Sequence, residues 1–437
     1  MPRLYLFTTL TGDEIANRDV VAQSGQCNRG AVRAGIPPPR PPPGNFERRG
    51  WKRWNEDPAG DWNVYWASVT TTRNMFNPDS GFRLGDHQLV NHFPNHYELT
   101  RKDLMYKNVK RYRKDLRKAG YDDARLNFVP TTFILPQDYT LFLEEHKKGR
   151  VGTWIFKPHG RAQGRGIFLV NKLSQIKRLG PKGGGSGERN PLDMYVICEY
   201  IDRPLLVGGR KFDLRVYVVV ASYRPLIAYI ARAGFARFCN VKYSSEAGEL
   251  RNSEMHLTNV AVQKGGDQYN ASHGNKWAMA DVFQYLAAVR GSAAAWKLRE
   301  DMDFLVVHSL KAVQSVMISD KHCFEMYGYD IMIDDDLKPW LLEANASPSL
   351  STTTPEDKAL KMRVINDTLQ VVSPPNWSSV DSRRAKAFPE KVGCLELLYN
   401  ETEELQAVRS SPAPRRGAGF QRPGTVGTPR RNPSMRV

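Results

Sequence analysis

The sequence has few cysteines and no long apolar run, and each shortage excludes whole classes of protein. Its five cysteines are odd in number, widely spaced and free of Cys-X-X-Cys pairs. They predict reduced thiols of a cytosolic chain rather than a disulfide framework or a zinc site. No stretch approaches the ~18 consecutive apolar residues that a membrane-spanning helix needs. The short apolar run near the start is followed by Asp13 and Glu14, which is a poor match to a signal peptide.

Acidic residues are also scarce relative to basic ones. Among 437 residues, 46 acids stand against 63 lysines and arginines, a net charge of +17. Such an excess predicts an acidic partner: nucleic acid, an anionic membrane or an acidic protein. Much of it lies in two terminal segments, a leader over residues 1–45 that ends Pro-rich and an Arg-rich tail over residues 409–437. Both have the composition of disordered chain.

Between these segments the periodicity predicts an α/β (α+β) chain with a real core. A Trp and Tyr cluster near residue 60, including Trp51 and Trp62, predicts core packing. Strands are expected at residues 154–156, 167–170, 195–201, 214–223 and 226–230, and a half-buried helix at residues 298–317. A further helix is expected at residues 100–120, opened by a capping box of Thr100 and Asp103. It holds nine cations and two acids, which indicates either a solvated face or a contact for an acidic partner.

Several nucleotide-binding and catalytic motifs are missing. There is no Gly-Lys pair of a phosphate-binding P-loop, no protein-kinase signature and no His-Glu-X-X-His. A different Gly-rich segment, Lys157-Pro-His-Gly-Arg-Ala-Gln-Gly-Arg-Gly166, lies between two expected strands. Its glycines allow backbone N–H groups to approach phosphate oxygens, and Lys157 and Arg165 add charge. Gly-rich hairpin loops are common, so this segment alone does not establish phosphate binding.

Three charged residues precede the most apolar expected strand. Lys211, Asp213 and Arg215 alternate, so they share one face of an extended chain. Charges on an otherwise buried strand are costly unless they meet a ligand or one another. Either a ligand site or a structural salt bridge fits this pattern.

The sharpest pattern is an expected hairpin of residues 329–334 and 338–343. If Asp336 and Leu337 form a two-residue loop, Asp330 pairs with Glu343, and Asn345 follows on the same face. Two carboxylates and an amide oxygen suit Mg²⁺. A solvated acidic hairpin is the alternative, but it fits residues 334–336 better than the apolar surroundings of Asp330 and Glu343.

Other polar residues fit a site for small charged ligands. His256, Thr258 and Asn259 follow an expected loop, and Arg232, Arg237 and Lys276 stand among apolar or aromatic residues. Guanidinium and ammonium groups in such surroundings suit small carboxylates.

Four motifs together give the chain a resemblance to a known family. They are Asn91-His-Phe-Pro-Asn-His-Tyr-Glu-Leu-Thr-Arg-Lys102, residues 208–215, residues 256–259 and residues 338–350. Over roughly residues 46–405 the chain resembles the tubulin tyrosine ligase-like family of ATP-grasp amino-acid ligases, and within it the polyglutamylases. The resemblance implies an ATP-grasp fold with N-terminal (46–95), central (96–206) and C-terminal (207–372) domains, followed by an extension (373–408).

The resemblance also implies roles for individual residues. Mg²⁺ would be held by Asp330, Glu343 and Asn345, and the incoming glutamate by Arg237 and Lys276. Lys157, Lys211 and Arg215 would be the catalytic cations. The implied ATP-binding residues are Lys157, Gln163, Gly164, Arg165, Gly166, Cys198, Glu199, Tyr200, Ile201, Lys211, Phe212, Asp213, Arg215, Thr258 and Asn259.

The activity implied is Mg- and ATP-dependent ligation of glutamate to the side-chain carboxylate of glutamates in acidic tubulin tails, through an acyl-phosphate. The resemblance further implies non-catalytic partner subunits and a place in the cytoplasm and cytoskeleton, including the cilium axoneme and basal body. No membrane or nucleic-acid role is expected. Two alternatives remain: a ligase of the same fold that adds glycine, and a non-catalytic basic protein that binds microtubules.

Overall fold

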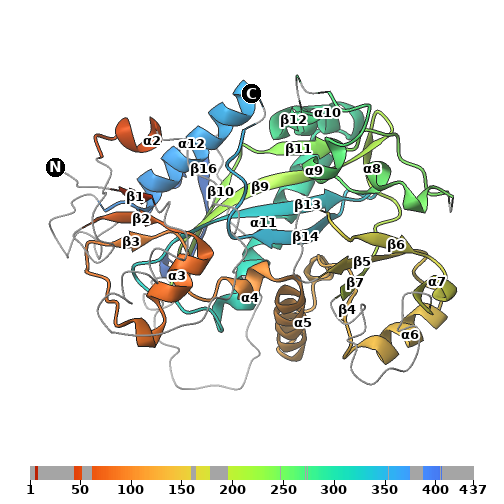
Figure 1. Ribbon diagram of the computed structural model, residues 1–437, viewed down its shortest axis with the longest axis horizontal. Helices are drawn as coiled ribbons and strands as arrows, with labels where there is room; N and C mark the ends of the chain where they lie inside the picture. Colours follow the sequence, from red (N-terminus) through yellow and green to blue (C-terminus); the bar gives the residue numbers. More distant parts are fainter. Residues whose placement is uncertain are drawn as a thin grey trace, which may run out of the picture. The chain divides into compact units, whose positions relative to one another are not determined.

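A computed structural model describes residues 5–7, 44–51, 62–158, 164–177, 195–246, 248–270, 272, 274–352, 354–374, 387–403 and 405. The chain divides into two compact units, Met1–Glu401 and Thr402–Val437. Every helix, strand and cavity discussed below belongs to the first unit (Figure 1). The Arg-rich tail, Gln163, Trp54 and nearly all of the leader lie outside the described residues.

The largest sheet has nine strands in a mixed α+β arrangement. Its central strand, β9, pairs antiparallel with β13 along one edge and with β11 and then β10 along the other. The sheet comprises β8 (Leu206–Val207), β9 (Arg210–Tyr223), β10 (Leu226–Ala231), β11 (Phe235–Phe238), β12 (Lys276–Ala278), β13 (Glu325–Ile333), β14 (Pro339–Asn345), β15 (Lys391–Val392) and β16 (Leu395–Asn400).

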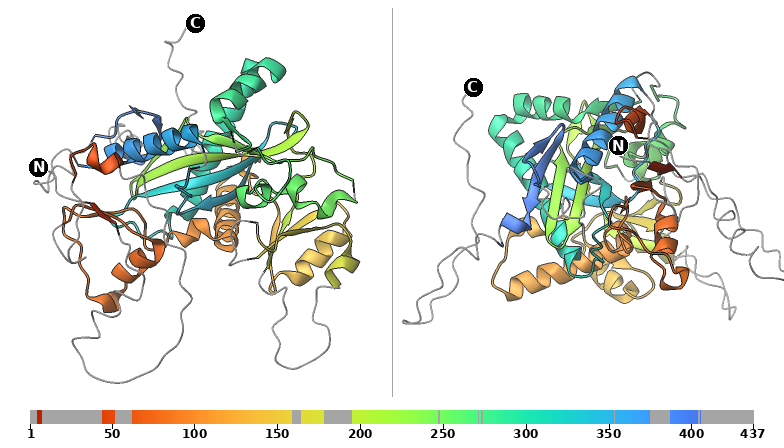
Figure 2. Two further views of the ribbon diagram at one scale, coloured as in Figure 1. Left: turned by 45° about the horizontal axis from the view of Figure 1, so that its top comes forward. Right: turned by 90° about the vertical axis from the view of Figure 1, so that its left-hand side faces the viewer.

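Strand β9 is buried on both faces because helices cover both. Leu214, Val216 and Val218 belong to a core shared with α10 (Met279–Arg290) and α11 (Ser292–Gln314). On the other face, Tyr217 and Val219 pack in a core shared with α12 (Pro355–Val372). Figure 2 shows α11 and α12 on opposite faces of the sheet. The first residues of the α12 face, Lys211, Asp213 and Arg215, are charged and line a cavity.

Two smaller sheets flank this framework. One has the order β4-β7-β5-β6 and packs on α6 and α7 through a core that includes Phe142 and Trp154. The other is the parallel set β1-β2-β3, beside the aromatic cluster in which Trp62 and Tyr65 are buried. The bounds are β1 (Tyr5–Phe7), β2 (Val64–Trp66), β3 (Leu89–Val90), β4 (Thr132–Ile134), β5 (Trp154–Pro158), β6 (Phe168–Val170), β7 (Tyr195–Glu199), α6 (Tyr139–Lys147) and α7 (Leu173–Lys177).

The remaining helices complete the unit. These are α2 (Gly44–Glu47), α3 (Val69–Met75), η1 (Pro78–Ser80), α4 (Tyr97–Thr100), α5 (Lys102–Lys118), η2 (Ala124–Leu126), η4 (Glu249–Arg251), α8 (Ser253–His256) and α9 (Val260–Gln263). No helix among the described residues is long and apolar enough to cross a membrane. The four cysteines that the structure describes are free thiols.

The expected strands and the long helix α11 are confirmed, but the helix at residues 100–120 needs correction. Thr100 ends α4, Arg101 is extended, and α5 begins at Lys102. The capping box is therefore wrong. Asp103 accepts hydrogen bonds from the Arg101 guanidinium, and because Arg101 is extended, Thr100 does not occupy the N-cap position of α5.

Candidate active site

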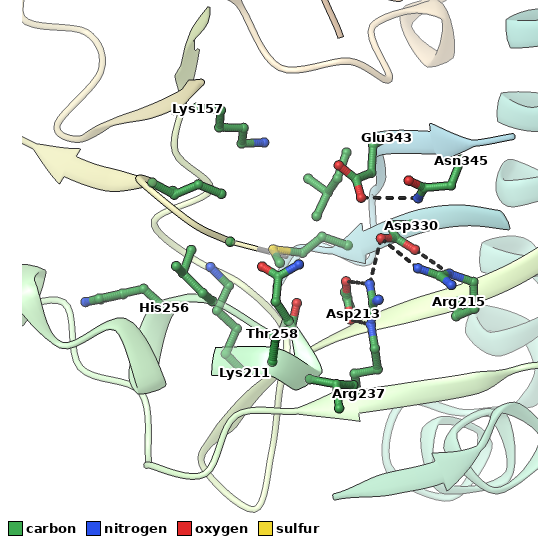
Figure 3. Close-up of a pocket in the computed structure, with 18 of the residues that line it drawn as sticks. Lys157, Lys211, Asp213, Arg215, Arg237, His256, Thr258, Asp330, Glu343 and Asn345 are labelled. Atoms are coloured by element: carbon green, nitrogen blue, oxygen red, sulfur yellow. Dashed lines mark hydrogen bonds and ion pairs between the residues drawn. The ribbon is translucent and has the colours of Figure 1, made fainter. Parts of the chain in front are cut away.

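A cavity of about 500 Å³ opens between the nine-stranded sheet and the β4-β7-β5-β6 sheet. Strands β5 and β7 supply one wall and strands β9, β11, β13 and β14 the other. Figure 3 shows Lys157 of β5 across the cavity from Asp330 and Glu343 of β13 and β14. Within the wall from the larger sheet, β9 contributes the charged residues of its first half, Lys211, Asp213 and Arg215. The cavity is therefore charged on the side of the larger sheet.

Strand register brings charged residues from distant parts of the sequence into rows across this wall. Glu343 pairs with Asp330, and Asp330 pairs with Arg215 on β9. In the neighbouring row, Asp213 pairs with Arg237, and Arg237 with Lys276. Side chains that share a face and lie directly opposite are within contact distance. The register thus makes one charged surface from five strands.

The expected pairing of Asp330 with Glu343 is confirmed, although the expected loop is wrong. The turn has three residues rather than two: Asp334 accepts the N–H of Leu337, and its own N–H binds the carbonyl of Lys338. Leu337 has a φ of 61°, as such turns require. A β-bulge between Asp330 and Ile331 leaves Leu342 as the extra residue on β14. The three-residue turn shifts the pairing of β13 with β14 by one residue, and the bulge shifts it back, so that Asp330 lies opposite Glu343.

Asp330 is held by two guanidinium groups. Its oxygens accept from Arg215 Nε at 2.6 Å and Arg215 Nη2 at 3.2 Å, and lie 2.8 Å from Arg237 Nη2. Arg237 also binds Asp213, with Nε 2.8 Å from Oδ1. Burial lowers the pKa of Arg237, but Asp213 and Asp330 outweigh it and raise that pKa well above its usual value. Two carboxylates and two guanidiniums therefore form one buried, charged network.

Glu343 is held by a separate cation. Lys102 Nζ, at the first residue of α5, lies 2.7 Å from Glu343 Oε2. Asn345 Nδ2 donates to Glu343 Oε1 at 3.1 Å and to the carbonyl of Gly328 at 3.3 Å. Burial raises the pKa of Glu343, but the Lys102 ammonium and the Asn345 amide more than offset this and lower it. Glu343 is thus ionised at neutral pH.

A chain of hydrogen bonds links the two sheets at the other end of the cavity. Lys211 Nζ donates to the Tyr200 hydroxyl at 2.8 Å, and that hydroxyl is 2.8 Å from His256 Nδ1. His256 Nε2 lies 3.0 Å from the carbonyl of Glu249 and must carry the proton there. Nδ1 therefore accepts from Tyr200. Burial lowers the pKa of Lys211 to about 8.

A third cluster combines Lys276, Asp357 and Lys361. The Asp357 carboxylate lies 3.0 Å from Lys276 Nζ and 3.0 Å from Lys361 Nζ. Asp357 lies in the first turn of α12, whose N-cap is Thr354. Lys276 Nζ also stands 4.8 Å from the centre of the Phe235 ring. Two ammonium groups sharing one carboxylate give this end of the cavity a net positive charge.

Most of the expected site residues line this one cavity. They are Lys157, Gly164, Glu199, Tyr200, Ile201, Lys211, Asp213, Arg215, Arg237, Thr258, Asn259, Lys276, Asp330, Glu343 and Asn345. Gly164 has a φ of +78°, and a Cβ there would lie 2.9 Å from Val262 Cγ2 and 3.1 Å from Asn259 Oδ1. Only glycine fits that position without displacing Val262 or Asn259.

Four expected residues do not line the cavity. Phe212 points to the opposite face of β9, in the apolar core beside Phe238, as strand alternation requires. Cys198 packs behind the cavity with Val196. Arg165 and Gly166 are exposed beyond the lining. Arg232, also singled out from the sequence, binds Asp303 and Glu396 elsewhere.

Three lysines that the sequence did not mark as site residues also line the cavity: Lys102, Lys264 and Lys361. The helical pattern places Lys102 among the surface charges of its helix, although Lys102 is also the last residue of the motif that begins at Asn91. Its place in that motif is the one feature of the sequence that points to a role for Lys102 in the site. Lys361 lies in a helix with no distinctive pattern, and only the packing of α12 on the sheet brings it to Asp357.

Asp330, Glu343 and Asn345 are the candidate metal ligands of the cavity. No set of three or more His, Cys, Asp or Glu side chains suited to a metal occurs in the part of the chain that the structure describes. Asp330, Glu343 and Asn345 form a smaller set of hard oxygens on paired strands. Asn345 donates through Nδ2 to Glu343 and to the carbonyl of Gly328, so neither hydrogen bond uses its Oδ1. This set fits a Mg²⁺ ion that takes its remaining ligands from phosphates and water.

Comparison with known proteins identifies the family of this chain. Residues 81–380 match the tubulin-tyrosine ligase family, and the chain belongs to that family. Membership implies an ATP-dependent ligase.

Relatives in the family share most of the chain. A probable alpha-tubulin polyglutamylase, Ttll1 of Tetrahymena thermophila, is 49% identical over 377 residues, 82% of this chain and 90% of the relative. A probable tubulin polyglutamylase, TTLL9 of Bos taurus, is 43% identical and covers 81% of this chain and 80% of its own. The tubulin polyglutamylase TTLL5 of Homo sapiens is 35% identical over 80% of this chain and 28% of its own.

Proposed function

We propose that this chain is an ATP- and Mg-dependent tubulin polyglutamylase. The observation that carries the proposal is a single cavity in which Asp330, Glu343 and Asn345 face a surplus of cations, in a member of the tubulin-tyrosine ligase family. The named polyglutamylases among its relatives support the same activity. A protein that only bound microtubules would have no use for buried carboxylates opposite buried cations, since both are costly to desolvate.

The cavity walls suit the parts of a nucleotide. Eight lysines and arginines line the cavity against four acids. The cations are Lys102, Lys157, Lys211, Arg215, Arg237, Lys264, Lys276 and Lys361, and the acids are Glu199, Asp213, Asp330 and Glu343. The surplus of positive charge suits phosphates. Tyr200 and Ile201 of the β7 end, with Met332, offer apolar surface for a base. Magnesium would be held by Asp330, Glu343 and Asn345, where it would withdraw charge from the phosphates.

The reaction needs an activated acceptor because a carboxylate is a poor electrophile. The side-chain carboxylate of a tubulin-tail glutamate takes the terminal phosphoryl group of ATP and becomes an acyl phosphate, with ADP as the product. The amine of free glutamate then attacks the acyl carbon, phosphate leaves, and an isopeptide bond forms. Lys157, Lys211 and Arg215 bind and orient the phosphates and offset their charge. No protein nucleophile is required.

The choice of amino acid is assigned to the Lys276 end of the cavity. Arg237 and Lys276 pair across β11 and β12, but Arg237 already binds two carboxylates. Lys276 and Lys361 share Asp357, so together they retain charge for a ligand carboxylate. A dicarboxylic amino acid fits this surplus better than glycine, which favours glutamate over the glycine-adding alternative.

The remaining expectations stay proposals. They include the ATP-grasp assignment with its three domains, the non-catalytic partner subunits, and a location in the cytoplasm and cytoskeleton with the cilium axoneme and basal body. The acidic tail of tubulin is the expected acceptor, which suits the basic composition of the chain.

One assay tests the activity. The purified chain, with and without candidate partner subunits, is incubated with microtubules, Mg-ATP and isotopically labelled glutamate or glycine. Mass spectrometry of tubulin-tail peptides then locates any added residue. We expect glutamate on tail glutamates, and only with Mg-ATP. Addition of glycine alone would establish the alternative ligase. Tight microtubule binding with no added residue under any condition would establish the binding protein.

A further inference from the structure

The outward face of α5 is densely basic and largely free of acidic partners. Lys107, Lys110, Arg111, Lys114 and Lys118 are exposed, and within the described residues none of them forms an ion pair. By contrast, Arg101 pairs with Asp103 and Arg117 with Asp122 at the two ends of the helix. The opposite face packs into the core through Met105 and Val109. Helix α5 therefore presents a row of unneutralised cations to solvent.

This basic row leads into the active-site cavity. Lys102 is the first residue of α5, and its ammonium lines the cavity and pairs with Glu343. Tyr106 and Lys110 follow at four-residue steps, which places all three along one side of the helix. Lys110 Nζ lies 5.7 Å from the centre of the Tyr106 ring. Figure 1 shows α5 beside the gap between the β4-β7-β5-β6 sheet and β14. The same helix thus touches both solvent and the candidate metal-binding carboxylate.

The dimensions of α5 suit an extended peptide. Its 17 residues span about 25 Å at 1.5 Å per residue. Seven or eight residues of extended chain cover about the same length. A peptide with a carboxylate at most positions would meet a cation at each helical turn. A single exposed ion pair contributes little, but a row of them gives additive, salt-sensitive attraction.

We propose that an acidic peptide docks along α5, with its acceptor carboxylate delivered to Lys102 at the mouth of the cavity. The proposal rests on the proposed function, because it locates the acidic substrate of that reaction. Lys102 acts as a positioning residue: its ammonium is the cation common to the helix and the cavity. The exposed lysines and Arg111 hold the residues that follow the acceptor, so binding depends on their charge rather than on shape.

Peptide binding tests the proposal without any turnover. The probe is a fluorescein-labelled 12-residue peptide with eight glutamates, followed by fluorescence anisotropy at two salt concentrations with the full chain. Charge reversal by Lys110→Glu with Lys114→Glu is expected to weaken binding about tenfold and to flatten its salt dependence. A matched reversal on α12, Lys358→Glu with Arg363→Glu, changes the same net charge at exposed positions and is expected to alter affinity less than twofold.

Lys102 is tested by a conservative pair of variants. Lys102→Arg is expected to bind the peptide as the parent chain does, whereas Lys102→Met weakens binding several-fold. Circular dichroism and binding of a fluorescent ATP analogue report whether each variant is folded. Equal losses in the α5 and α12 variants would overturn the proposal. So would unchanged binding in the α5 variant, or equally tight binding of a single-stranded oligonucleotide of matched charge that α5 reversal leaves intact.

The docking proposal and the proposed function fail in different ways. If α5 reversal abolishes peptide binding but no condition supports glutamate ligation, α5 binds acidic peptides and the enzymatic assignment is wrong. If glutamate is ligated to tubulin tails with the same KM for tubulin in parent and α5 variants, the activity stands and the docking proposal is overturned.

Discussion

Asp330 and Glu343 lie directly opposite each other on β13 and β14, yet each carboxylate is neutralised by its own cations. Asp330 is bound by Arg215 and Arg237, whereas Glu343 is bound by Lys102. Like charges on paired strand positions repel, and this division of partners relieves the repulsion. Because the partners differ, substitution of Asp330 and substitution of Glu343 should affect activity and stability differently.

Replacement of Glu343 by glutamine is expected to abolish ligation while leaving the fold intact. The amide keeps the shape of the side chain but loses the negative charge that would hold Mg²⁺ with Asn345. Turnover should fall roughly 100-fold or more. Lys102 loses its partner, but its side chain is 25% exposed and can reach water. Labelled-glutamate incorporation and a thermal melt measure the two effects.

The matched control is Asp336→Asn in the turn of the same hairpin. Asp336 is exposed, and among the described residues its ion-pair partner is the exposed Arg203, so activity and stability should change little. If Glu343→Gln retained activity, the Glu343 carboxylate would not be needed for the reaction. A large loss in Asp336→Asn would show that any change to the hairpin is disruptive.

Replacement of Asp330 by asparagine is expected to destabilise the fold. Within the described residues Arg215 would lose the carboxylate that it pairs with, and Arg237 would keep only Asp213. Both guanidiniums are buried. An uncompensated charge in the interior costs about 3–5 kcal/mol. Urea denaturation should therefore show a much larger loss of stability for Asp330→Asn than for Glu343→Gln. An equal loss of unfolding free energy in the two variants would contradict the conclusion that Asp330 and Glu343 are neutralised by different cations.

The hairpin of β13 and β14 shows how much of this site the sequence predicts. The pairing of Asp330 with Glu343 followed from alternation and an assumed loop. It is confirmed only because a longer turn and the bulge at Leu342 compensate for each other. Apolar burial on both faces of β13 fixes which residues pair, since a one-residue slip would place Asp330 in the core. Turn length, in contrast, is set by local chemistry that composition does not reveal.

The ion-pair partners were beyond sequence reasoning. Lys211, Asp213 and Arg215 share a face, as alternation predicts, but Asp213 pairs with Arg237 rather than with either neighbour. That choice depends on β11 lying beside β9, which is tertiary structure. Lys102 and Lys361 reach the site from helices whose placement follows from packing on the sheet. Local patterns identified the carboxylates because their chemistry is rare in strands. Lysines on helices are too common to stand out.

The contact between α5 and α11 is expected to make stability depend on pH. His308 on α11 is 2.8 Å from the Tyr112 hydroxyl of α5. Burial, with a smaller effect of Lys311, lowers the pKa of His308 to about 4. His308 is therefore protonated in the unfolded chain below about pH 6.5, whereas in the folded chain it stays neutral until the pH approaches 4. Stability is complete above pH 6.5 and is lost as pH falls, by about 2 kcal/mol at pH 5.

His308→Gln provides the comparison, because glutamine accepts a hydrogen bond from Tyr112 but does not titrate. Urea denaturation at pH 7.0, 6.0 and 5.0 should show a smaller loss of stability in the variant. Parallel losses in both proteins would mean that other groups carry the acid sensitivity.

Nucleotide binding is expected to weaken above pH 8 because of Lys211. Its pKa, lowered by burial to about 8 from 10.5, means that the ammonium facing the cavity is lost as pH rises through 8. The neighbouring Cys239 has its pKa raised by burial to about 12, so that thiol contributes no charge in this range. Affinity for a non-hydrolysable Mg-ATP analogue should fall about five- to tenfold between pH 7 and pH 9.

The same linkage requires proton uptake on binding, because phosphates favour the charged lysine and raise its pKa. At pH 8 about half of the Lys211 side chains are neutral, so about half a proton should be taken up per nucleotide bound. Calorimetry in two buffers of different ionisation enthalpy measures this number. In Lys211→Arg the guanidinium stays charged throughout, and both the uptake and the pH dependence should vanish. Equal proton uptake in the parent and the variant would assign the titration to a group other than Lys211.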